Sequence, residues 1–148
     1  MKIIDNKSLP KAIIRLWQSA RKRICISIDG HSMRPFFQKN DHLELALSPP
    51  NVFQHKIGDI IAFLQDDIII VHRFIKKKKI NNKWMVCQRG DNLPGFRWID
   101  SDQIIGTAVA IYRHGKTINL QDRFYILQNR FLGSLSWIWI FCVKQLST

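Results

Sequence analysis

Apolar residues recur at two different spacings along this chain. Between residues 8 and 22 they recur every three or four positions, at Leu9, Ile13, Leu16 and Trp17. This spacing predicts a short amphipathic helix over 8–22, capped by Ser8 and carrying Pro10 in its first turn. We expect the helix to pack on the rest of the protein; the alternative is that its basic face lies on a membrane.

From residue 23 to residue 120 apolar residues alternate with polar ones or form short runs rich in β-branched residues. The first run, Arg23 to Ile28, alternates basic or polar residues with isoleucines. Later runs, separated by turn residues such as Gly-Asp and Asp-Asp, occupy 43–47, 60–64, 68–75, 84–88, 98–102, 104–112 and 117–120. Short strands without a long helix between them predict a mainly β fold, either a curled antiparallel sheet or a partly open barrel. The lysines at 76–79 and Asn81-Asn82 are expected to form a solvated hairpin tip, and an anion-binding patch is the alternative reading of the lysines.

Residues 121–148 return to a helical pattern and are rich in aromatic residues. The run from Phe131 to Val143 contains no charged residue. A helix of that length spans roughly 20 Å, which is shorter than a hydrocarbon core of ~30 Å. Three aromatic residues in the run suit a helix that lies at a membrane interface or under a partner: Trp137, Trp139 and Phe141. Whether this tail spans, rests on or avoids a bilayer stays open.

Composition limits the classes of partner and the cellular compartment that we expect. The chain has 148 residues, which suits one domain, and 23 Lys and Arg against 11 Asp and Glu give a formal net charge of +12. This charge favours anionic partners such as nucleic acid, an acidic lipid surface or acidic peptides. Cys25, Cys87 and Cys142 form no C-x-x-C pair, which argues against a disulfide framework or a zinc site and favours a reducing compartment. We find no signal peptide or N-terminal anchor and expect a cytoplasmic or peripherally membrane-associated protein that needs no metal or cofactor.

The candidate chemistry begins at a polar elbow, residues 29–35, which comes after the first predicted strand. Ser32 stands between Gly30 and Pro35. Glycine permits backbone angles that other residues avoid and proline fixes its own φ, so the serine is expected on a stiff bend that suits a nucleophile. A lone Gly-x-Ser is common by chance, and its significance depends on motifs further along the chain. The histidines outside this pattern are expected at the surface: His31, His42, His55 and His114.

Three further fragments come after GHSMRP at 30–35 in a fixed order: GDI at 58–60, VHRF at 71–74 and RGDN at 89–92. Together they resemble the signal peptidase I and LexA-like superfamily of serine peptidases over residues 25–120. In that family the Gly-x-Ser-Met-x-Pro box carries the nucleophile, and a later strand carries the general base. Bacterial signal peptidases and LexA-like proteins place a lysine at the base position, whereas the endoplasmic-reticulum, archaeal and sporulation types place a histidine followed by arginine. His72-Arg73 resembles the second group, which implies that Ser32 is the nucleophile and His72 the base. A histidine pKa near 6.5 suits that task.

The resemblance also implies a carboxylate after the base. The later aspartate, Asp100 in WIDSD, is the expected third catalytic member, and Asp91 in RGDN is the alternative or supports the site. The intervening residues 93–98 depart from the usual spacing of the family. A carboxylate would orient the imidazole and stabilise the imidazolium, and the backbone amide of Ser32 is expected to contribute to an oxyanion hole.

These residues lead to one favoured function and two alternatives. The favoured function is a serine endopeptidase that cleaves a leader or signal segment from a peptide or precursor protein. The first alternative is a peptide-binding relative that does not cleave. The second, a LexA-like regulator, is less favoured, because the segment before Ser32 holds at most one helix and a helix-turn-helix needs two. Nucleic acid is therefore an unlikely partner despite the basic charge.

Overall fold

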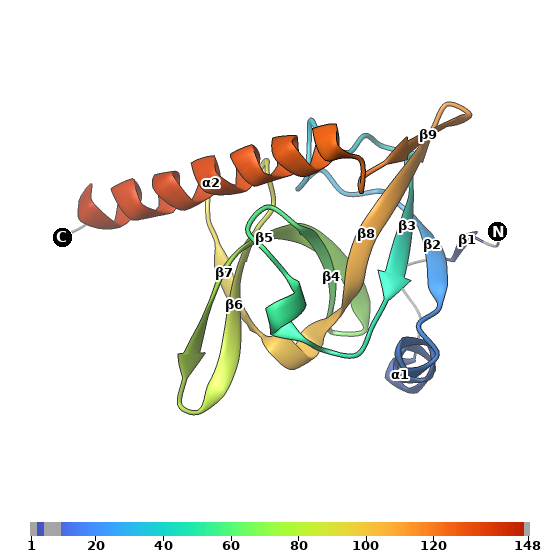
Figure 1. Ribbon diagram of the computed structural model, residues 1–148, viewed down its shortest axis with the longest axis horizontal. Helices are drawn as coiled ribbons and strands as arrows, with labels where there is room; N and C mark the ends of the chain where they lie inside the picture. Colours follow the sequence, from blue (N-terminus) through green and yellow to red (C-terminus); the bar gives the residue numbers. More distant parts are fainter. Residues whose placement is uncertain (1–2, 5–9, 147–148) are drawn as a thin grey trace.

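The computed structural model describes residues 3–4 and 10–146, and these form one curled, unclosed sheet of nine strands with two α-helices (Figure 1). The strands run β1-β2-β3-β8-β4-β5-β6-β7 across the sheet, and β9 pairs with β8. The strands are β1 Ile3–Ile4, β2 Arg23–Ser27, β3 His42–Leu47, β4 Ile60–Gln65, β5 Ile68–Ile80, β6 Lys83–Arg89, β7 Arg97–Asp100, β8 Ile104–Arg113 and β9 Lys116–Asn119. The helices are α1 Lys11–Ser19 and α2 Arg123–Leu146, and the short 3-10 turns are η1 Val52–Gln54 and η2 Ser101–Gln103. The predicted mainly β fold is confirmed.

The main hydrophobic core lies against the curl of the sheet. The isoleucines of β2 and the leucines of β3 are buried, and the two strands pair antiparallel. Each such side chain contributes about 1.5–3 kcal/mol relative to leaving it exposed. These two strands lead the chain into and out of the elbow that carries Ser32, so the core fixes where that elbow stands.

Helix α1 packs on the sheet, as predicted, but of the predicted apolar residues that the structure describes only Trp17 packs against the main core. Its buried residues are Ile14 and Gln18, whereas Ile13 and Leu16 are exposed. The Gln18 side-chain amide donates hydrogen bonds to the carbonyls of Ser48 and Ile104, which turns that side of the helix inward. Pro10 is the N-cap residue and makes no side-chain cap hydrogen bond, and the predicted cap Ser8 lies outside the described residues.

The β5–β6 hairpin corrects the expected position of the lysines. Asn81 and Asn82 both have positive φ, 48° and 64°, and form the two-residue turn by themselves. The lysines at 76–79 therefore lie within β5 and pair with residues 84–87. The register shifts between Phe74 and Lys76, so that Gln88 stands opposite Phe74. This bulge decides which side of the sheet the Gln88 side chain occupies.

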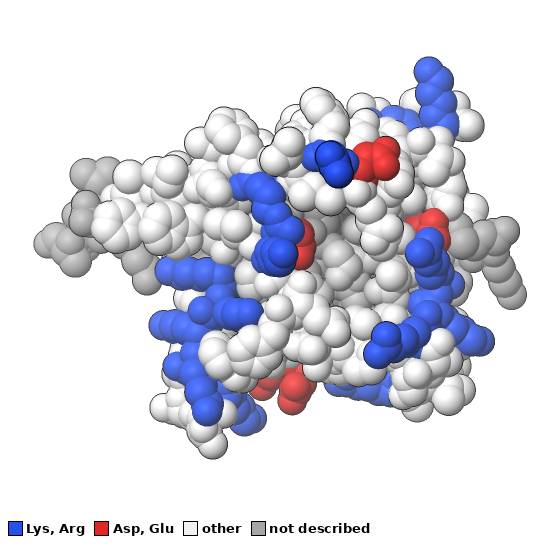
Figure 2. Space-filling view, viewed as in Figure 1, with Lys and Arg blue, Asp and Glu red and all other residues white. Residues whose placement is uncertain are grey.

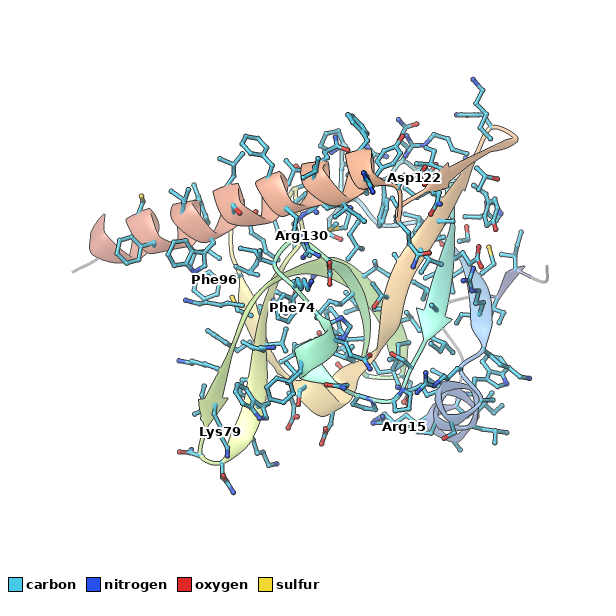
Figure 3. All side chains as sticks on the ribbon, in the orientation of Figure 1. Arg15, Phe74, Lys79, Phe96, Asp122 and Arg130 are labelled. Carbon is cyan, nitrogen blue, oxygen red and sulfur yellow. The ribbon has the colours of Figure 1, made fainter. Side chains whose placement is uncertain are left out.

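Helix α2 runs along one side of the sheet and extends past it (Figure 1). The helix approaches the β4–β5 region at Gly58, whose φ is +92°. A Cβ atom on Gly133 of α2 would lie 2.6 Å from the Gly58 Cα, and one on Gly58 would overlap the Asn129 carbonyl. The Arg130 guanidinium, which points from α2 toward the sheet in Figure 3, donates to the Ile57 carbonyl and pairs with Asp59 at 3.1 Å. Among the described residues no helix has the length and hydrophobicity to cross a membrane.

Candidate active site

The elbow that carries Ser32 is held by the RGDN segment. The Ser32 carbonyl accepts a hydrogen bond from the Asn92 amide at 2.8 Å, and the His31 carbonyl accepts one from the Asn92 side chain at 3.3 Å. A Cβ atom on Gly90 would lie 2.6 Å from the Ser32 carbonyl oxygen. Gly90 is therefore required for this close approach. Gly30 is different, because its φ lies outside the left-handed region and a Cβ atom there would contact nothing within 4 Å.

His72 lies on β5 with 9% of its surface exposed. Its Nδ1 is 2.5 Å from the side-chain oxygen of Gln88. An amide oxygen only accepts hydrogen bonds, so Nδ1 carries the proton of the neutral ring and Nε2 keeps its lone pair. Burial, the largest influence, lowers the pKa of His72 below its ordinary 6.5, and the nearby charge of Arg97 lowers it further. The Gln88 hydrogen bond and the charge of Asp91 act in the opposite direction without outweighing burial. The ring is thus neutral at pH 7.

Ser32 and His72 line the same cavity, of about 320 Å³. Its other walls are mostly apolar and come from the end of β2, from the elbow and from the first half of β5. A second cavity of about 430 Å³ shares Ile70 and His72 with the first and is also lined by Gln88, Arg89, Arg97 and the loop 93–96. His72 therefore borders both cavities, and each is large enough for one or more side chains of a peptide.

The first half of β5 is a strand edge. Residues 68–73 of β5 pair with β4, whereas pairing with β6 begins only at Arg73. Among the described strands, the segment from Ile68 to His72 thus has a partner on one side only. Unpaired strand edges accept an additional extended chain through backbone hydrogen bonds. This edge forms one wall of the cavity that contains Ser32 and His72.

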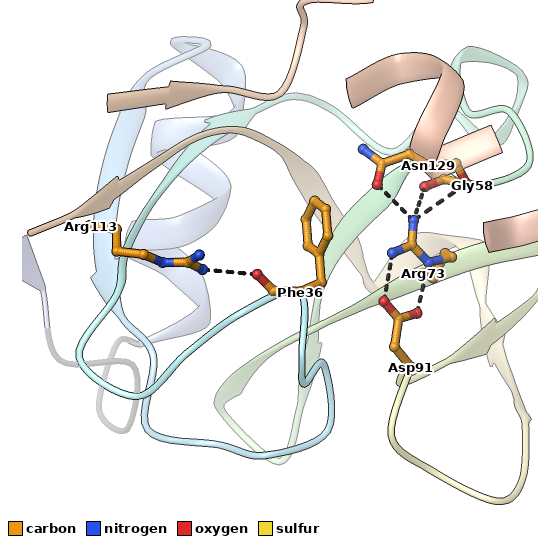
Figure 4. A network of polar contacts seen from close by, with 6 residues as sticks. All are labelled: Phe36, Gly58, Arg73, Asp91, Arg113 and Asn129. Atoms are coloured by element: carbon orange, nitrogen blue, oxygen red, sulfur yellow. Dashed lines mark hydrogen bonds and ion pairs between the residues drawn. The ribbon is translucent and has the colours of Figure 1, made fainter. Parts of the chain in front are cut away.

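Arg73, the neighbour of His72, joins four segments that are far apart in sequence (Figure 4). Its side chain is completely buried and binds both carboxylate oxygens of Asp91, at 2.7 and 2.6 Å. The same guanidinium donates to the Gly58 carbonyl and to the Asn129 side chain of α2, and it lies 5.5 Å from the Phe36 ring beside the elbow. Paired, hydrogen-bonded burial of this kind is what a guanidinium needs inside a protein. The network fixes the elbow, the RGDN segment, β5 and α2 relative to one another.

Asp91 and Asp100 do not hold the His72 ring. Asp91 binds Arg73 and influences His72 only through its charge. The carboxylate of Asp100 accepts from the Asp102 amide, in the capping box of η2, and lies 3.9 Å from Lys83. The group that holds Nδ1 is Gln88, which belongs to none of the sequence motifs. If the β5–β6 hairpin continued from the Asn81-Asn82 turn without a bulge, Gln88 would pair with Ile75. Its side chain would then lie on the face of the sheet opposite to that of His72.

Two further expectations are corrected by the structure. His55 is buried, not at the surface, and burial lowers its pKa. The lysines of β5 lie over aromatic rings, with Lys78 4.7 Å from the Trp98 ring and Lys77 4.6 Å from the Phe53 ring. Aromatic faces attract ammonium groups, so these contacts stabilise Lys77 and Lys78 along the strand surface. Across the described residues no group of three His, Cys, Asp or Glu side chains could hold a metal ion.

Comparison with known proteins adds no assignment: no family model and no curated protein matches this chain.

Proposed function

We propose that this protein is a serine endopeptidase of the signal-peptidase-like superfamily, in the branch that uses histidine as the base. The observation that carries the proposal is that Ser32 and His72 line one cavity, with His72 Nδ1 bound to Gln88. The two residues come from separate elements. Their convergence beside an open strand edge is the arrangement that nucleophilic cleavage of an extended peptide requires.

The proposed reaction is acyl transfer through Ser32. The lone pair on His72 Nε2 removes the hydroxyl proton as the Ser32 oxygen attacks the scissile carbonyl, and the resulting imidazolium then protonates the leaving amine. Water hydrolyses the acyl-enzyme by the same route in reverse. Gln88 fixes the ring tautomer, and the charge of Asp91 favours the imidazolium from its position on Arg73. The Ser32 backbone amide is our candidate donor to the oxyanion.

The substrate we propose is an extended segment of a peptide or precursor protein, such as a leader. Its backbone would pair with the open edge of β5 from Ile68 to His72, and a side chain beside the scissile bond would enter the largely apolar cavity near Ser32. The chain beyond the scissile bond would continue toward the second cavity, which Arg97 lines.

The test is digestion of a mixed peptide library by the purified full chain, read by mass spectrometry. Ser32→Ala and His72→Ala should each lower the cleavage rate by at least about 10³-fold, because both act on the same proton transfer. Ser19→Ala and His114→Ala are matched controls, since both residues are exposed and lie outside the two cavities. Native activity should fall on acidification through a pKa below 6.5, where His72 becomes protonated.

The outcomes separate the proposal from its alternatives. Equal cleavage by the native chain and both active-site variants, all folded, would contradict the proposed pair. Peptides that bind the native chain and Ser32→Ala equally, with no cleavage by either, would instead support a peptide-binding relative.

A further inference from the structure

Helix α2 carries a stripe of exposed apolar side chains on the side that faces away from the sheet. We call its members the apolar stripe: Phe124, Leu127, Phe131, Leu135 and Ile138. Steps of three and four residues place them on one side of a helix. Their exposed fractions are 69%, 70%, 63%, 46% and 51%. The opposite side of α2 holds its buried residues Asn129, Gly133 and Ile140.

The packing of α2 on its own domain touches this stripe only at its edge, where Leu135 lines a cavity of about 730 Å³ together with Phe36 and Ile111. The helix is held by Asn129, Arg130 and Gly133 in its middle and by Ile140, which packs on Ile75 and Cys87. Tyr125 also packs against the main core, and the Arg89 guanidinium lies 4.3 Å from the centre of the Trp139 ring. Scattered exposed apolar residues are ordinary on a protein surface, but a continuous row along one helix face marks a contact with another apolar phase. The stripe is therefore a candidate contact surface for a partner outside the described residues.

Charge identifies the chemistry of that partner. Helix α2 contains no Asp or Glu, and it begins at the exposed residue Arg123. Near its C-terminal half, Lys76 and Lys78 lie over Trp98, which packs with Ile140 of the helix. Figure 2 shows basic side chains gathered over β5 and β6, below the half of α2 that leads to the C-terminus and that carries no charged side chain in this view. Lys76 and Lys78 lie on the sheet side of α2, so among the side chains described on the helix the basic residue that is free to meet a surface is the exposed Arg123. An apolar row on a protein with a net charge of +12 and no acidic residue on the helix is complementary to anionic headgroups over acyl chains.

Exposed aromatic residues flank the stripe and fit a lipid surface. Trp137 and Phe141 stack on each other with ring centroids 6.0 Å apart and are 42% and 54% exposed at the border of the stripe. Tryptophan concentrates at the headgroup level of a bilayer, and both Trp and Phe occur on the apolar face of interfacial helices. We propose that α2 binds an anionic phospholipid surface, with the apolar stripe buried at the boundary between headgroups and acyl chains. This inference does not depend on the proposed peptidase activity.

The docking would also orient the site. Arg73 binds both Asp91 and Asn129 of α2, so the helix is fixed to the strand that carries His72. A bilayer under α2 would then hold the cleft at a set distance from the lipid surface. Substrates at that surface would then reach the cleft more readily than substrates free in solution.

The experiment is sedimentation of the full chain with vesicles, either of phosphatidylcholine alone or with phosphatidylglycerol added. We expect binding to the anionic vesicles that weakens with added salt, and weaker binding to the neutral ones. Leu127→Ser and Phe131→Ser should each lower the partition coefficient by about tenfold, because each removes a large apolar side chain from the contact. Leu16→Ser is the matched control, since Leu16 is 67% exposed on α1.

Every outcome bears on the proposal. Native protein that stays in solution with both vesicle types would overturn it, and so would stripe variants that bind as well as the native chain. A dimer in light scattering that both stripe substitutions abolish, without lipid binding, would overturn it by assigning the stripe to a second copy of this chain. Ser32→Ala should bind vesicles like the native protein, so a failure here is distinct from a failure of the peptidase proposal.

Discussion

The side chain that binds Nδ1 of His72 is Gln88, a neutral amide. A carboxylate in the same place would bring a negative charge to the ring. The amide oxygen fixes the Nδ1 proton, and Nε2 remains available as a base. The negative charge near the ring comes from Asp91, which is already neutralised in part by Arg73. Orientation and charge are therefore supplied by two different residues. The Gln88 hydrogen bond therefore fixes the orientation of the ring, while burial keeps the ring neutral.

At the residue scale we predict that Gln88 is a positioning residue. Gln88→Leu should lower the cleavage rate by about 10- to 100-fold, because the ring loses the bond that fixes its orientation. It should also lower the pKa of His72 further, since the Gln88 hydrogen bond raises it. The acidic limb of the pH–rate profile would then move to lower pH. A loss of rate with an unchanged profile would indicate only a structural role.

Two companion variants sharpen that measurement. Gln88→Glu keeps an acceptor for Nδ1 and adds a negative charge, so the acidic limb should move to higher pH with substantial activity retained. Asp100→Asn should leave rate and profile unchanged, because Asp100 caps η2 and does not hold the His72 ring. A large loss of activity in Asp100→Asn, with the fold intact, would restore it as the third catalytic member.

At the scale of elements, the close contact between α2 and Gly58 can be tested with Gly133→Ala. Helix propensity and the structure predict opposite effects of this substitution on stability. Helix propensity alone predicts that Gly133→Ala stabilises the protein by about 1 kcal/mol. The structure predicts the reverse, because the new Cβ would lie 2.6 Å from backbone atoms of Gly58. We expect a loss of about 1–3 kcal/mol in the free energy of unfolding in urea.

Gly95→Ala is the control for that substitution. A Cβ atom at Gly95 meets nothing within 4 Å, and its φ is not in the left-handed region. Its free energy of unfolding should stay within about 0.5 kcal/mol of the native value. A stabilised Gly133→Ala protein would show that α2 sits further from the β4–β5 region than described.

For the whole molecule, acid stability depends on two carboxylates that join β3 to β8. Burial, the largest influence on Asp41, would raise its pKa, but the hydrogen bonds from Arg113 and Gln38 and the charge of Arg113 together hold the pKa below 3.8. The hydrogen bond from Tyr112, the largest influence on Glu44, holds the pKa of that carboxyl below 4.5. Groups whose folded pKa is lowered stabilise the fold above their unfolded pKa.

We therefore predict that stability is lost as the pH falls below about 4.5 and through the lowered pKa values of these two groups. The measurement is the urea midpoint of the native chain and of Asp41→Asn from pH 7 to pH 3. The variant should be less stable at pH 7, and the difference should shrink as the pH falls through the lowered pKa of Asp41. A difference in urea midpoint that stays constant from pH 7 to pH 3 would contradict the lowered pKa assigned to Asp41.

Features that depend on near neighbours in the chain can be derived from the amino-acid sequence. Period-two apolar runs, the Asn81-Asn82 turn and the helical spacing after residue 121 specify a mainly β fold with a C-terminal helix, since each pattern acts through local backbone geometry. The order of the motifs also singles out Ser32 and His72, which the structure places on one cavity.

Features that depend on register and on contacts between distant segments arise only in the folded chain. The bulge after Phe74 moves Gln88 to the side of His72, and no local pattern marks it, because a shift of one residue reverses every later side chain. Arg73 meets Asp91 and Asn129 only after β5, the RGDN segment and α2 have packed together. The inward face of α1 is likewise set by the acceptors that Gln18 finds on the sheet, since hydrophobicity alone would have turned Ile13 and Leu16 inward.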